Sequence, residues 1–186
     1  MGKYMSKDIN KFKHISGALE IKKFFGCNNC PEKLYAKDGD KIQYGIGNIY
    51  TDTMFVLPNY DINIKTNYDN ILELLINAYK ELRGKDILEE VYISRILKCF
   101  HHSSYNLENK AIDCCITHLF NEMYKHKGNN IILFGNTYDI LCKYKADFDL
   151  ILNYKVIQIC YSPAMIFYNK DKFMEDFECC LTSFDL

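Results

Sequence analysis

The sequence is poor in proline, has no tryptophan and carries almost no net charge. Its three prolines are scattered at positions 31, 58 and 163, and no proline- or glycine-rich linker, internal repeat or low-complexity stretch divides the chain. A chain of 186 residues, 48% of them hydrophobic, is therefore expected to form one domain over residues 1–186 with a sizeable core. A formal net charge of −1 gives no support for nonspecific nucleic-acid binding.

The sequence also lacks the long apolar run of about 18 residues that a membrane-spanning helix needs, so no membrane partner is expected. Its polar N-terminal segment has no apolar stretch of the secretory type. Nine cysteines in such a chain favour an intracellular, reducing compartment such as the cytoplasm or a nucleus. Grouped thiols there are more often metal ligands than disulfides.

Four apolar runs rich in β-branched and aromatic residues are typical of strands buried on both faces of a parallel sheet. They span residues 53–57, 90–97, 130–134 and 156–161. Helical periodicity lies around them, at residues 7–25, 68–82, 108–124 and 170–181, with a shorter helix after Asn136 that ends before Asp147. This alternation predicts an α/β fold, a three-layer α/β/α sandwich with a central four-stranded parallel sheet. Functional residues are expected where the strands end.

Cysteine spacing points to a metal site. Cys27 and Cys30 form a C-x-x-C pair after a predicted helix, which is the wrong context for a thioredoxin-like redox pair. Cys99 ends a predicted strand, and either Cys114 or Cys115 is the fourth candidate; Cys115 shares a helical face with Ile112 and Leu119 and is preferred. Spacing does not separate zinc from an iron–sulfur centre. The remaining cysteines fall in apolar patterns and are expected to be small core residues: Cys142, Cys160, Cys179 and Cys180.

Six segments, in order, resemble the iron–sulfur uracil-DNA glycosylases of families 4 and 5 over nearly the whole chain. They read CNNCP (27–31), GIGN with TMFV (45–48, 53–56), VYISRILKC (91–99), AIDCCITHL (111–119), IILFGNTYDIL (131–141) and CYSPAMIFYNKDKFMEDF (160–177). The resemblance implies a uracil-DNA-glycosylase-like fold and a structural [4Fe–4S] cluster in place of zinc. It selects Cys115 over Cys114, which gives the ligand set Cys27, Cys30, Cys99 and Cys115.

The catalytic residues of that family are missing at the first strand end. Pro58 stands where the resemblance places a water-positioning acidic residue. Asn59 and Asp61 are candidate replacements, although turn residues are common after proline. Tyr60 is the nearest candidate for the ring that stacks on an extruded base.

The base-reading and terminal-loop positions also differ. Arg95 replaces the family's pyrimidine-reading asparagine, and a guanidinium only donates hydrogen bonds. Asn136, after the third predicted strand, completes the candidate base pocket with Tyr60 and Arg95. Ser162 aligns with the family's catalytic histidine, and a hydroxyl is the weaker donor to a developing anion. The DNA-binding candidates form the loop Ser162, Pro163, Ala164 and Met165; the same loop could simply pack on the core.

Histidines offer a replacement acid. His101 and His102 follow Cys99 on a polar segment, where solvated surface histidines are also common. His14, His118 and His126 fall on predicted helices and are expected to be surface or interface residues.

Two functions follow. The favoured one is a divergent, non-catalytic member that binds DNA or serves as a protein-interaction subunit in replication, repair or transcription. The alternative is an active DNA glycosylase with a rebuilt site, using Asp61, Asn59, Ser162 or His101 on uracil or a modified base. A zinc-stabilised module without a nucleic-acid role is a third, weaker hypothesis.

Overall fold

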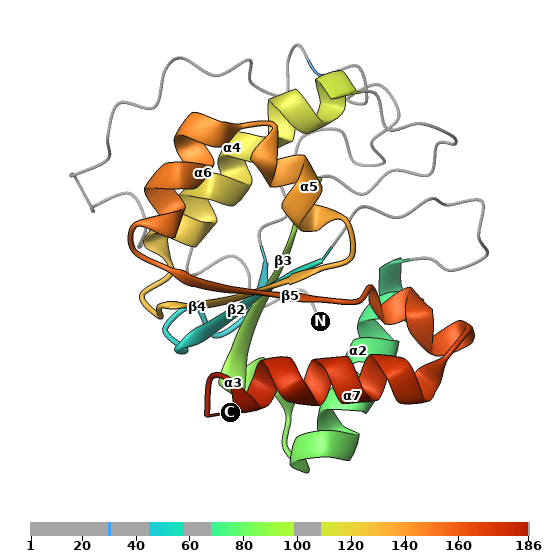
Figure 1. The fold of residues 1–186 in the computed structure, drawn as a ribbon. Helices are drawn as coiled ribbons and strands as arrows, with labels where there is room; N and C mark the ends of the chain where they lie inside the picture. The colour runs from blue at the N-terminus through green and yellow to red at the C-terminus, as the bar shows by residue number, and fades with distance from the viewer. Residues whose placement is uncertain (1–29, 31–44, 58–67, 99–108, 186) are drawn as a thin grey trace, which may run out of the picture.

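Five strands form one mixed sheet with helices on both sides (Figure 1). The computed structural model describes Cys30 and residues 45–57, 68–98 and 109–185. Strands β2 (Thr53–Leu57), β3 (Val91–Arg95), β4 (Asn130–Phe134) and β5 (Val156–Cys160) are parallel, and β1 (Ile46–Gly47) pairs antiparallel with β3. The order across the sheet is β1-β3-β2-β4-β5. The α/β class is confirmed, but the sheet is mixed and five-stranded instead of purely parallel and four-stranded.

Helices cover the two faces of the sheet separately. On one face lie α4 (Asn109–Lys125), α5 (Thr137–Cys142) and α6 (Lys145–Leu152), and on the other lie α2 (Tyr68–Arg83) and α7 (Lys170–Thr182) (Figure 1). Two short helices complete the order, α3 (Ile87–Glu90) before β3 and the 3₁₀ helix η4 (Pro163–Phe167) after β5. Among the described helices, none has the length and apolarity needed to cross a membrane.

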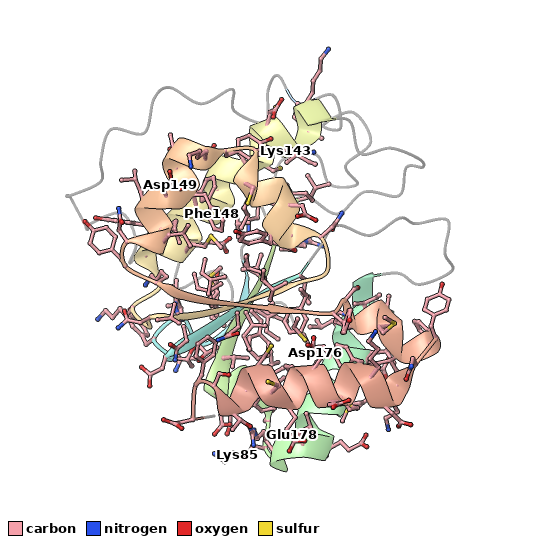
Figure 2. The ribbon with its side chains drawn as sticks, viewed as in Figure 1. Lys85, Lys143, Phe148, Asp149, Asp176 and Glu178 are labelled. Carbon is pink, nitrogen blue, oxygen red and sulfur yellow. The ribbon has the colours of Figure 1, made fainter. Side chains whose placement is uncertain are left out.

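Strand β2 joins two apolar cores because successive side chains point to opposite faces of a sheet. Met54 and Val56 pack in the core under α4, α5 and α6, whereas Phe55 and Leu57 pack in the core under α2 and α7. In Figure 2, Phe148 of α6 points into the core under α4, α5 and α6, and Asp149 lies on the outer side of the same helix. Phe177 of α7 lies in the core under α2 and α7, and its ring meets those of Phe55 and Phe134 edge-on.

Local patterns placed most elements within a residue or two. Strands β2 and β4 have the predicted bounds, α2 and α7 extend one residue past their predicted ends, and α4 is shifted by one residue at both ends. The short helix predicted after Asn136 and before Asp147 is confirmed as α5, but the separate helix α6, which begins at Lys145 after a turn, was not predicted. The helix predicted over residues 7–25 lies outside the described residues.

Strand β5 was predicted to be buried on both faces, and this is wrong. Among the described strands it pairs only with β4, so it forms an edge of the sheet that they build. Its apolar side chains Val156 and Ile159 are 54% and 49% exposed. Strand β1, at the other edge, was missed because two residues are too short for a periodic pattern.

Candidate functional site

Three buried thiols lie on the face of the sheet that α4 covers. Cys30, Cys114 and Cys115 are 8%, 6% and 3% exposed and belong to one apolar cluster. Burial raises the pKa of the Cys114 thiol, and so does the neighbouring Cys30 thiol, which is hydrogen-bonded to it. Together they bring the pKa of Cys114 to about 11. Cys30 therefore contacts Cys114 of α4, although the two residues are distant in sequence.

The predicted four-cysteine set is described only in part, because Cys27 and Cys99 lie outside the described residues. Both candidates for the fourth ligand are buried, and they differ in their neighbours. Cys114 contacts Cys30, whereas Cys115 interacts electrostatically with Lys98, the residue before Cys99. Among the described residues, Cys30, Cys114 and Cys115 do not form a group whose sulfur atoms all lie within 4.8 Å of one another. A soft or borderline metal would bind such thiols as thiolates and displace their protons.

A buried ion pair lies beside these thiols. Lys98 and Glu122 are 1% and 4% exposed, and the Lys98 ammonium contacts Glu122 Oε2 directly. Ser94 donates to Glu122 Oε2 at 2.8 Å and Tyr92 to Oε1 at 2.6 Å, while the backbone N–H of Gly45 donates to Oε1 at 2.7 Å. Burial lowers the pKa of Lys98, an effect that Glu122 opposes. This carboxylate therefore connects β3, α4 and the segment before β1.

Helix periodicity explains this arrangement. Cys115, His118 and Glu122 follow one another at spacings of three and four, so they share a stripe of α4. Burial lowers the pKa of half-buried His118, and the charge of Lys98 lowers it further. On β3, Tyr92 and Ser94 alternate onto the face that α4 covers. The stripe thus places a thiol, an imidazole and a carboxylate close to Lys98.

The strand order creates a second feature, a topological switch point. From β2 the chain continues to β3 on one side, then crosses back to β4 on the other side of β2. In open α/β sheets, ligands bind outside the carboxyl ends of the two strands at such a point. Asn136 follows β4 there, after Gly135, which has φ 61° and donates its N–H to Cys160 O at 2.8 Å. Arg95 ends the neighbouring strand β3.

The segment after β5 was predicted as a loop and is the 3₁₀ helix η4. Ser162 is its N-cap, and its hydroxyl accepts a hydrogen bond from Ala164 N–H at 3.3 Å. Pro163 is buried, and Met165 packs against the core under α2 and α7. The four predicted DNA-contact residues thus belong to one packed turn next to the switch point.

Exposed aromatic rings flank this turn. Tyr161, Phe167 and Tyr168 are 39%, 54% and 75% exposed. The Lys172 ammonium lies 4.9 Å from the centre of the Tyr161 ring. Aromatic rings beside a lysine form a surface on which bases can stack. The predicted residues after β2 and β3 lie outside the described residues: Asn59, Tyr60, Asp61, His101 and His102.

Several sequence predictions about polar and cysteine side chains are wrong. Cys142 and Cys179 are exposed, not core residues. His126 is 1% exposed and stacks on Tyr92, with ring centres 6.2 Å apart, so it is not a surface residue. Lys98 and Glu122 were not singled out at all, since charged residues on an amphipathic helix or at a strand end ordinarily face water.

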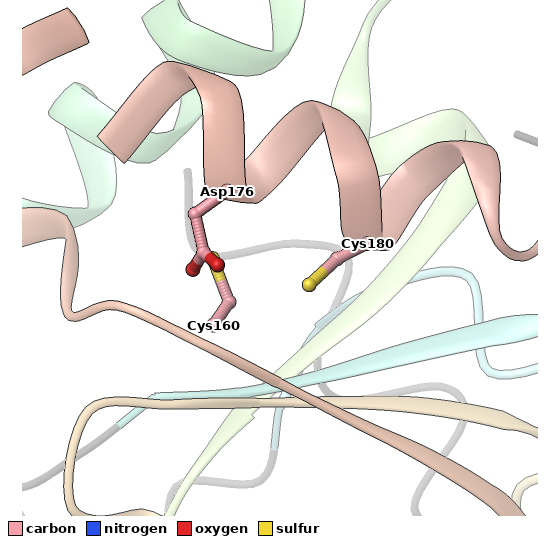
Figure 3. Close-up of side chains that lie close together, drawn as sticks. All are labelled: Cys160, Asp176 and Cys180. Atoms are coloured by element: carbon pink, nitrogen blue, oxygen red, sulfur yellow. The ribbon is translucent and has the colours of Figure 1, made fainter. Parts of the chain in front are cut away.

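A further group of metal-ligating side chains lies on the opposite face of the sheet. Cys160, Asp176 and Cys180 have ligand atoms that are all within 4.8 Å of one another, and together they can hold a metal ion (Figure 3). Sequence reasoning missed this group because its members lie on a strand and on a helix that only the fold brings together.

Comparison of the sequence with protein-family models and with curated proteins found no match to either.

Proposed function

We propose that this chain is a divergent iron–sulfur protein of the uracil-DNA glycosylase type that binds single-stranded DNA without excising a base. The proposed cluster is [4Fe–4S] on Cys27, Cys30, Cys99 and Cys115. The observation that carries the proposal is the contact between the C-x-x-C segment and the cysteine pair of α4, at Cys30 and Cys114. The cluster would supply structural cross-linking between these segments.

The surroundings of the thiols support a structural metal centre. Cys115 lies within electrostatic range of Lys98, which directly precedes Cys99 in the sequence. An ammonium near thiolates favours their charged form and offsets part of the negative charge of a thiolate-bound cluster. The apolar residues of the same core keep water away from the sulfurs.

The absence of catalysis is inferred from the groups at the strand ends. Cleavage of an N-glycosidic bond needs a positioned water and a donor to the departing base. Pro58 has no ionisable group, and Ser162 offers only a hydroxyl, which donates to a developing anion more weakly than an imidazole does. The exposed rings beside η4 support base stacking and favour DNA over a protein partner.

Cysteine replacement tests the cluster. After anaerobic purification, the wild-type chain should contain iron and acid-labile sulfide and show broad visible absorption. Cys30→Ala and Cys115→Ala should lose most of the iron because each removes a ligand. Cys142→Ala, an exposed cysteine of α5, should keep it and serves as the matched control. A colourless protein with zinc and no iron contradicts the cluster. Iron lost from Cys114→Ala but retained in Cys115→Ala makes Cys114 the fourth ligand.

Aromatic replacement tests the DNA surface. Base stacking on one aromatic ring is worth about 1–3 kcal/mol, so Tyr168→Ala should weaken binding of a single-stranded oligonucleotide about tenfold or more in fluorescence anisotropy. Tyr124→Ala is the control, because Tyr124 is 54% exposed on α4, away from η4. Uracil-containing DNA should yield no abasic sites. Efficient excision contradicts the non-catalytic proposal, and equal binding by both variants contradicts stacking at η4.

A further inference from the structure

Helix α7 and strand β5 present three metal-ligating groups to one another. Cys160 is the last residue of β5, and Asp176 and Cys180 are four residues apart on the face of α7 that packs on the sheet (Figure 3). Figure 2 shows Asp176 on this inner side and Glu178 on the outer side of the helix. Cys160 and Cys180 are 2% and 4% exposed, and Asp176 is half-buried.

Hydrogen bonds already orient the three side chains. The backbone N–H of Tyr161 donates to Asp176 Oδ2 at 2.8 Å, which fixes one carboxylate oxygen and leaves the other for a ligand. Cys180 Sγ lies 3.5 Å from Ile159 O. The hydrogen bond with Cys180 and burial raise the pKa of Cys160, and the same hydrogen bond lowers the pKa of Cys180. Outer contacts of this kind hold ligands in place in known metal sites.

We propose that Cys160, Asp176 and Cys180 form a binding site for one zinc-class divalent cation. Two thiolates and a carboxylate suit a borderline-soft ion of tetrahedral preference, and water would take the fourth position. Binding releases the two thiol protons to solvent, so two thiols and one dication give one bound metal and two protons.

The required adjustment is small. Sulfur atoms on one tetrahedral zinc, with Zn–S near 2.3 Å, lie about 3.8 Å apart. The three ligand atoms are already within 4.8 Å of one another. Side-chain rotations that move these atoms by about 1 Å therefore suffice to bring them to the separation that zinc requires. Half-buried Asp176 provides the route of entry from solvent. The site is separate from Cys30, Cys114 and Cys115, which lie in the core on the other face of the sheet.

The proposal is tested by cobalt and zinc titration of the full-length chain, purified without oxygen. Wild type should bind about one equivalent of cobalt more than Cys160→Ser and show stronger thiolate-to-cobalt charge-transfer absorption. Asp176→Asn keeps an acceptor for Tyr161 N–H but removes the charged ligand. It should weaken zinc binding about tenfold or more, since the loss of even an outer contact costs about 10–100-fold. Zinc should also raise the thermal unfolding midpoint of wild type but not of Cys160→Ser.

Cys179→Ser is the matched control, because this exposed neighbour of Cys180 does not belong to the group. It should bind the metal as wild type does. Loss of the metal from Cys179→Ser, or equal metal content and affinity in wild type, Cys160→Ser and Asp176→Asn, overturns the proposal. So does a Cys160–Cys180 disulfide in freshly isolated protein whose reduced form takes up no additional metal. Since the readout is the difference between variants, it is independent of any iron held by the other cysteines.

Discussion

Replacing Glu122 with leucine should lower the free energy of unfolding by about 3–5 kcal/mol, because it leaves the Lys98 ammonium buried without its counter-charge. The same carboxylate accepts hydrogen bonds from Tyr92, Ser94 and the backbone of Gly45, and these donors would lose their acceptor as well. Urea unfolding followed by circular dichroism measures the change. Glu178→Leu, at an exposed position of α7, is the control and should change stability by no more than about 0.5 kcal/mol.

A double-mutant cycle separates the ion pair from the general cost of the substitution. Lys98→Met combined with Glu122→Leu removes both charges, so the double variant should be more stable than the sum of the single losses implies. We expect a coupling energy of about 2 kcal/mol, within the range found for residues in contact. Additive losses, or a cost below about 1 kcal/mol for Glu122→Leu alone, would show that the pair does not hold β3 against α4.

Acidification should destabilise the protein through His126, whose pKa is lowered to about 4 by burial and by the charge of Lys155. An exposed imidazole in the unfolded chain titrates near 6.5, so between these two values the unfolded state binds more protons. Stability is therefore retained above about pH 6.5 and falls as the pH drops toward 4. The full loss is about 3 kcal/mol, at about 1.4 kcal/mol per pH unit.

His126→Phe is the decisive variant for this prediction. The His126 ring stacks on Tyr92, so phenylalanine keeps the ring contact and removes the titration. Its stability at neutral pH should be similar or higher, and its pH dependence between 4 and 6.5 should be flatter than that of wild type. His118→Gln, at a half-buried position, is the control and should retain most of the slope. A slope unchanged in His126→Phe would assign the acid sensitivity to other groups.

The sequence by itself determined the elements whose signal is local. The apolar runs of β2 and β4 and the amphipathic patterns of α2, α4 and α7 identified these elements because burial against one sheet imposes periods of 2 or 3.6 residues. Sequence reasoning also singled out Cys30 together with the cysteine pair of α4. It missed β1, α3 and η4, which are too short for periodicity, and also the helix α6.

Only the tertiary structure decided which polar groups are buried and which distant residues meet. Glu122 fits the pattern of a solvated helix residue, and its partner Lys98 lies 24 positions away, so no local pattern marks them. Cys160 and Cys180 both fit an apolar pattern, yet they meet Asp176 because α7 packs on the end of β5. Local periodicity records which face of an element is apolar. The packing of elements sets which side chains on those faces come into contact, and here that packing produced both groups of thiols.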